Sequence, residues 1–76
     1  MHPRVKFWYE KFIAMGLDSE EAELMATLKY EIDRDRSFLS WLKQEGIRGL
    51  KGWAQTNCPW LYNFCEKVWG WIKSWF

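Results

Sequence analysis

Apolar residues recur at steps of three and four residues near the start of the chain. Pro3 suits the first turn of a helix, because the N–H that it lacks would have no intrahelical partner there. Gly16 is typical of the residue that follows a helix C-terminus. The apolar positions between them are Val5, Trp8, Tyr9, Phe12, Ile13 and Met15. The spacing predicts an amphipathic helix over residues 3–15.

A second apolar stripe follows after signals for a new helix start. Asp18 and Glu21 have the spacing of a capping box, in which side chains accept hydrogen bonds from the free N–H groups of the first turn. The stripe consists of Met25, Leu28, Ile32, Leu39 and Leu42. No Gly or Pro occurs between Asp18 and Gly46, so we expect one long helix over residues 19–45.

This second stripe is interrupted in the middle by charged residues. Asp35 occupies a position where an apolar residue is expected, within the charged run at 33–36. Asp and Ser are favoured N-cap residues, so Asp35 or Ser37 could instead begin a separate helix.

Glycines mark the following segment, residues 46–57, at positions 46, 49 and 52. Each glycine inside a helix costs about 1 kcal/mol relative to alanine. We therefore expect a Gly-rich hinge here, with at most one short helical turn. Gly46 and Ile47 fit the end of the preceding helix, with Ile47 packing back on Leu42.

The last segment predicts an amphipathic helix over residues 57–76, with Asn57 as its cap and Pro59 in its first turn. Its polar positions fall within an arc of roughly 120°, and they are Asn63, Glu66, Lys67, Gly70, Lys73 and Ser74. The remaining circumference is apolar. Its centre holds Leu61, Phe64, Cys65, Val68, Ile72 and Trp75, and its borders hold Trp60, Tyr62, Trp69 and Trp71. An apolar stripe that only faces a core is nearer 100° wide.

These patterns together predict an all-α fold. The expected architecture is a small three-helix protein with a short helix, a long helix, a Gly-rich hinge and a Trp-rich amphipathic C-terminal helix. Residues 1–47 would form an N-terminal helical hairpin, and residues 48–76 would form the hinge and the aromatic helix.

The aromatic content adds an expectation about the molecular surface. The 76 residues include 7 Trp, 5 Phe and 3 Tyr, and a chain this short buries only about 60% of the surface that it exposes when unfolded. Part of the aromatic surface should therefore stay exposed and mark an interaction site. The expected contact residues are Trp60, Leu61, Phe64, Val68, Trp69, Trp71, Ile72 and Trp75. The alternative is that this helix is mainly the core of a compact three-helix unit.

Charges within the last helix bear on how it would meet a membrane. About nineteen residues would reach roughly 28 Å, close to the ~30 Å hydrocarbon core, but Glu66 and Lys67 fall in the middle of the segment. A helix that lies in the membrane surface fits these charges better than one that spans the bilayer. Contacts to anionic lipid would come from Arg48, Lys51, Lys67 and Lys73.

Few residues offer catalytic or metal-binding chemistry. Cys58 and Cys65 are seven residues apart, about 10 Å along a helix, which is too far for a disulfide. The one histidine, His2, lies at the opposite end of the chain, so we expect no metal site, no cofactor, no small-molecule substrate and no enzyme. The net charge of +1 makes nucleic acid an unlikely partner. Without a signal-peptide pattern we expect a cytoplasmic protein, or one attached peripherally to a membrane.

The functional hypothesis is therefore a non-enzymatic accessory or adaptor protein. It would dock through its aromatic C-terminal helix onto a membrane surface or a membrane-associated protein complex. The alternative is a soluble inhibitor or small subunit that binds a groove of a partner protein or self-associates as a homo-oligomer.

Overall fold

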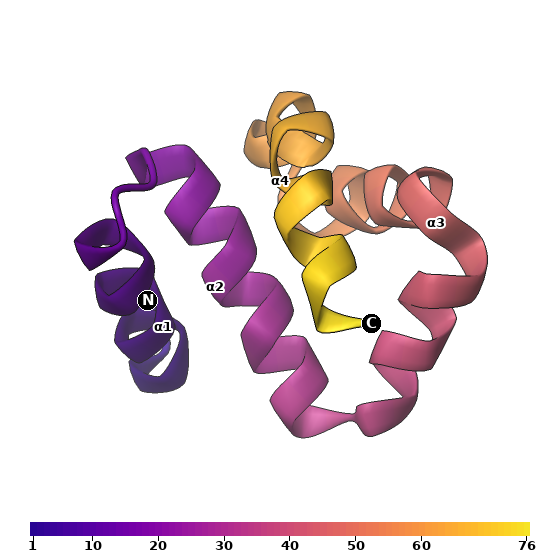
Figure 1. Ribbon diagram of the computed structural model, residues 1–76, viewed down its shortest axis with the longest axis horizontal. Coiled ribbons are helices and arrows are strands. Elements are labelled where there is room, and N and C mark those ends of the chain that lie inside the picture. The colour runs from indigo at the N-terminus through magenta and orange to yellow at the C-terminus, as the bar shows by residue number, and fades with distance from the viewer.

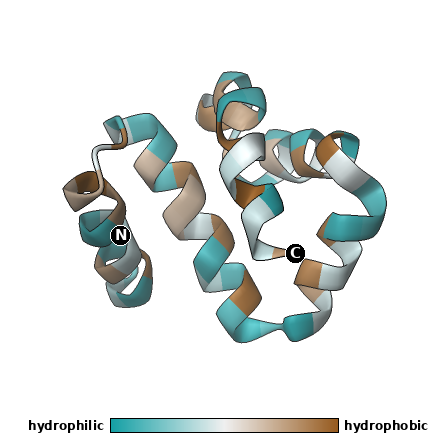
Figure 2. Ribbon diagram, in the orientation of Figure 1, coloured by the Kyte–Doolittle hydropathy of each residue, from teal (hydrophilic) through white to brown (hydrophobic).

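The computed structural model describes all residues, Met1–Phe76, and contains helices but no strands, which confirms the predicted all-α class. Its α-helices are α1 (Pro3–Ala14), α2 (Ser19–Arg34), α3 (Arg36–Asn57) and α4 (Cys65–Ile72). Two 3₁₀ helices flank α4: η1 (Pro59–Phe64) and η2 (Lys73–Trp75). Apolar and polar residues alternate along the helices, as amphipathic packing requires (Figure 2).

The turn between α1 and α2 forms through the local signals that the sequence contains. The Leu17 N–H donates to the carbonyl of Phe12 (3.1 Å), and the Gly16 N–H also donates back into the last turn, as in a Schellman motif. The Glu21 carboxylate accepts a hydrogen bond from the backbone N–H of Asp18 (3.1 Å), as the predicted capping box requires. α1 and α2 therefore pack side by side as a hairpin (Figure 1).

The prediction of one long helix over residues 19–45 is wrong, because the helix is interrupted at Asp35. This residue is extended, with φ −147° and ψ 106°. Its carboxylate accepts hydrogen bonds from the backbone N–H (3.0 Å) and the hydroxyl (2.7 Å) of Ser37. These bonds lower the pKa of the Asp35 carboxyl and cap α3. The alternative reading, a new helix capped by Asp35, is the one observed.

The hinge predicted over residues 46–57 is reduced to one residue. Gly46 is non-helical, with φ 70° and ψ −156°, and it divides α3 at a kink into two helical segments, residues 36–45 and 47–57. The helix end predicted at Gly46 is therefore present, but the residues after it are helical up to Asn57. Gly49 is buried, and a Cβ on it would collide with the side chain of Glu45. Two helical glycines cost about 2 kcal/mol, whereas burying Leu50 alone contributes roughly 1.5–3 kcal/mol. Tertiary burial is therefore of the size needed to offset the intrinsic preference.

The C-terminal segment is not the single α-helix predicted over residues 57–76. Asn57 does not cap it but ends α3, where its side-chain amide donates to the carbonyl of Trp53 (2.9 Å). Cys58 leaves helical geometry, and Pro59 opens η1 at the position predicted for it. The tighter 3₁₀ turns before and after α4 shift its faces relative to a continuous α-helix.

α2 lies between the other elements, with α1 on one side and α3, η1 and α4 on the other (Figure 1). One core links all of them. Its largest fully buried side chains are Leu24, Leu28, Leu42, Leu50, Leu61, Cys65, Val68 and Ile72. The two parts of the chain, 1–47 and 48–76, thus share a single hydrophobic core.

We predict that Gly46→Ala lowers the free energy of unfolding by about 1–3 kcal/mol, because its backbone conformation is almost closed to side chains with a Cβ. Gly52 is the matched control, since it lies in the same helix and a Cβ there meets nothing within 4 Å. Gly52→Ala should raise the free energy of unfolding by about 0.5–1 kcal/mol. Urea denaturation followed by circular dichroism measures both, and equal effects would contradict the bend at Gly46.

Candidate functional site

The eight contact residues predicted on the C-terminal segment divide into two groups. Leu61, Val68 and Ile72 are fully buried, so they belong to the core and have no surface to offer a partner in this conformation. The prediction that these three residues contact a partner is therefore corrected: they lie on the side of the segment that packs on α2 and α3. The others reach solvent: Trp60 is 64% exposed and Trp71 43%, while Phe64, Trp69 and Trp75 are half-buried.

The four basic residues predicted to contact an anionic surface differ in exposure and in pairing. Arg48, Lys67 and Lys73 are exposed. Lys51 instead pairs with Glu66 at 2.6 Å between its Nζ and the carboxylate Oε1. This pairing raises the pKa of Lys51 and lowers that of Glu66. Lys51 therefore already has an acidic partner within the chain.

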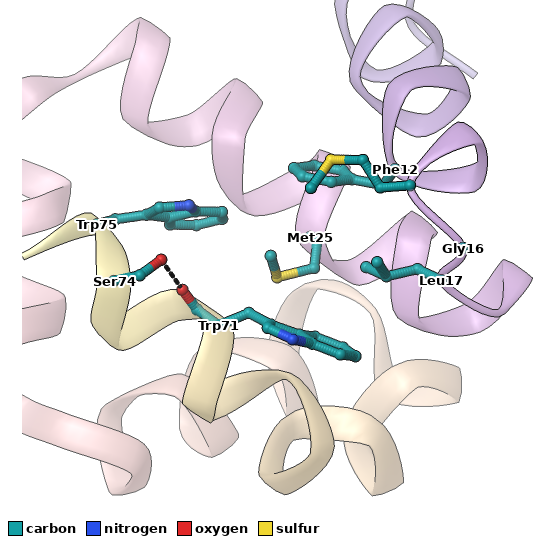
Figure 3. A pocket seen from close by; sticks show the side chains of 8 residues that line it. Phe12, Gly16, Leu17, Met25, Trp71, Ser74 and Trp75 are labelled. Atoms are coloured by element: carbon teal, nitrogen blue, oxygen red, sulfur yellow. Dashed lines mark hydrogen bonds between the residues drawn. The ribbon is translucent and has the colours of Figure 1, made fainter.

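An apolar groove lies between α1 and the C-terminal segment, with α2 as its floor (Figure 3). One wall comes from the end of α1 and the following turn, and the other from α4 and η2. The lining residues are Phe12, Met15, Gly16, Leu17, Met25, Trp71, Ser74 and Trp75. Met15, 71% exposed, and Trp71 are its most accessible apolar side chains. The groove thus joins residues that are about 60 positions apart in the sequence.

The size and lining of the apolar groove limit what it can hold. Its volume is about 290 Å³, at the lower limit of the ~300–1,000 Å³ typical of small-molecule sites. Ser74 is its only polar side chain, and its hydroxyl already donates to the carbonyl of Trp71. No charged or titratable side chain lines it. The groove therefore suits one or two apolar side chains better than a substrate that needs acid–base chemistry.

A lysine on α2 lies over two indoles, one from α1 and one from η2. The Nζ of Lys29, on α2, lies 4.5 Å from the ring centroid of Trp75 and 5.3 Å from that of Trp8. The Trp8 indole N–H donates to the carboxylate of Asp33 (3.0 Å). These cation–π contacts link α1 to Trp75, one of the lining residues of the groove, across α2.

The remaining indoles differ in how firmly they are held. Trp60, the most exposed, donates its N–H to the carboxylate of Glu23 on α2 (2.9 Å). The indole N–H groups of Trp71 and Trp75 donate to no acceptor within the chain, and neither lies buried without a partner. Both N–H groups are therefore left unpaired within the chain.

Sequence reasoning found the tryptophans of this groove but missed its other wall. Phe12, Met15 and Leu17 were placed in or just after the first helix, and Met25 in the stripe of the second. Their meeting with Trp71 and Trp75 depends on how three helices pack. The one available signal was Met15, an apolar residue beside Gly16 that the helix end itself does not require.

The two cysteines are buried free thiols. Burial raises the pKa of the Cys58 thiol to about 11 and also raises that of Cys65. A thiol with so high a pKa is protonated at neutral pH and is a poor nucleophile. No group of three or more metal-ligating side chains occurs anywhere in the structure.

Comparison with known proteins gives no relative to guide the assignment: no family model, curated protein or solved structure matches this chain. No helix is both long and apolar enough to cross a bilayer. The functional argument therefore rests on the apolar groove itself.

The burial of Cys58 predicts a loss of stability at alkaline pH. The unfolded thiol ionises near its ordinary pKa of 9.0, whereas the folded thiol keeps its proton up to about pH 11. Because the folded state binds more protons in this window, the free energy of unfolding falls as pH rises from 9 to 11, by roughly 2–3 kcal/mol for a shift of this size. Urea denaturation at pH 8 and pH 10.5 measures the fall.

Cys58→Ala provides the comparison for this pH effect. The variant is less stable overall because it loses buried volume, but its free energy of unfolding should fall less steeply between the same two pH values. An identical slope in the two proteins would show that Cys58 ionises as readily when folded as when unfolded.

Proposed function

We propose that this chain is a non-enzymatic adaptor that binds another protein by taking the partner's apolar side chains into the groove between α1 and the C-terminal segment. The observation that supports this most is the groove itself, apolar on both walls and on its floor and open at Met15 and Trp71. A helix laid in a groove, with apolar anchors one turn apart, is a common mode of peptide recognition.

The lining suits such an occupant energetically. Each large apolar side chain moved from water into the groove would contribute roughly 1.5–3 kcal/mol before ordering costs. Met15 and Met25 are unbranched and adapt to differently shaped anchors. The free N–H groups of Trp71 and Trp75 can donate to a backbone carbonyl or side chain of the partner.

A protein partner explains the shape better than a membrane surface does. Bilayer attachment uses apolar side chains that project from a helix face into the lipid. The apolar groove is hollow, and lipid would leave its walls unfilled or require them to rearrange. The exposed cations Arg48, Lys67 and Lys73 are on α3, α4 and η2 and are not part of its lining. Membrane attachment and self-association are the two alternatives that the experiment below distinguishes from binding of a partner protein.

The test is selection of random 16-residue peptides displayed against the immobilised full chain, followed by affinity measurement in solution. We expect peptides with bulky apolar residues at helical spacing. Met15→Glu should weaken their binding at least tenfold, because it places a carboxylate at the mouth of an apolar site. Ile13→Glu is the matched control. Ile13 is 40% exposed on α1 but does not line the groove, so the Ile13→Glu variant should bind the selected peptides with unchanged affinity.

Two results would contradict the proposal. One is that no selected peptide distinguishes Met15→Glu from Ile13→Glu. The other is flotation of the chain with vesicles of phosphatidylcholine and phosphatidylserine, with a blue shift of Trp fluorescence that Met15→Glu abolishes. A stable dimer in size-exclusion chromatography that Met15→Glu dissociates would assign the groove to a second copy of the chain instead.

A further inference from the structure

A line of exposed residues on α1 extends from the apolar groove along the helix. Arg4, Phe7, Lys11 and Met15 are spaced by three, four and four residues, so they lie within about 80° of the helix circumference. All four are exposed. We call this line the α1 stripe. It alternates cationic and apolar side chains, and its last member, Met15, is at the groove.

The centre of the α1 stripe is an exposed ring beside two cations. Phe7 is 45% exposed. The Arg4 guanidinium carbon lies 5.4 Å from its ring centroid, and the Lys11 Nζ lies 5.0 Å from it. These contacts hold an apolar surface and positive charge next to each other. An incoming ligand would therefore meet both at once.

Acidic side chains pair with only part of the positive charge of the α1 stripe. Asp33 on α2 contacts Arg4 at 3.4 Å and also accepts the indole N–H of Trp8. Lys11 forms no ion pair within the chain. The acids nearest to the groove lining along the chain are Asp18, Glu10 and Glu23. Asp18 lies at the start of α2, where the helix N-terminus offsets negative charge, and Glu23 accepts the indole N–H of Trp60. Glu10 is exposed on α1 about 100° around the helix from Lys11.

From this arrangement we infer the chemistry of the partner: an acidic amphipathic helix. The inference rests on the proposed docking function and adds its charge and its direction. The partner's apolar residues would enter the groove and contact Met15 and Phe7, and its carboxylates would meet Lys11 and Arg4. The α1 stripe spans eleven residue steps, about 16 Å of helix, so a partner helix of three turns presents groups at matching intervals.

The test uses the peptides selected on the full chain and two charge reversals on the same helix. Lys11→Glu lies in the α1 stripe, whereas Lys6→Glu lies about 140° away on α1, and both change the net charge equally. We expect the selected peptides to be rich in Asp and Glu. Lys11→Glu should weaken their binding about fivefold, the size of effect that surface charge pairs allow, and Lys6→Glu should leave it unchanged. High salt should weaken wild-type binding and have less effect on Lys11→Glu.

The outcomes separate this inference from the docking function. Peptides that bind through Met15 but are neutral or basic, or that bind Lys11→Glu and Lys6→Glu equally, would overturn the acidic partner and leave the docking function in place. Circular dichroism of each variant checks that α1 remains folded, because both lysines are exposed and their replacement removes no core contact. Absence of any Met15-dependent peptide would overturn both.

Discussion

The burial of α2 on two opposite sides is the constraint on which the rest of the structure depends. Ala22 and Ala26 are fully buried and share a face with Asp33, which bonds to α1. These small side chains allow α1 to approach closely. Leu24 and Leu28, also fully buried, point toward the other elements and supply the bulk of the contact there. Because α2 is covered on both sides, α1 and the C-terminal segment flank it, and the apolar groove lies between them over α2.

Local signals in the sequence were sufficient where the interactions that decide the structure are local. The helix ends at Gly16 and Asp18 depend on hydrogen bonds within six residues, so spacing alone predicted them. The break at Asp35 was ambiguous because a carboxylate can either face solvent in a helix or cap the next one. The segment after Gly46 was predicted wrongly because glycine preference is local, whereas the burial of Leu50 is a tertiary effect.

The candidate site could be predicted only in part, and for the same reason. A helical wheel identifies which residues of one helix are apolar, but it does not say which of them a neighbour covers. It therefore grouped Leu61, Val68 and Ile72 with Trp60 and Trp71, although the first three are enclosed and the last two are not. The borders of an amphipathic face are where amphipathic rings reach solvent. In this chain, those border positions gave the exposed indoles.

Hydrogen bonds and a cation–π contact distinguish the indoles that are held in place from the one that is not. Trp8 and Trp60 donate their N–H groups to carboxylates on α2, and Trp75 contacts the Lys29 ammonium. These bonds restrict ring motion, so a partner that contacts the rings loses less entropy in ordering them. The Trp71 ring has no such bond, and its N–H is unpaired, so it can move to accommodate an anchor. On the C-terminal wall, the apolar groove therefore combines one ring that a cation–π contact holds, Trp75, with one ring that has no such contact, Trp71. This combination is consistent with the proposed docking of an incoming side chain.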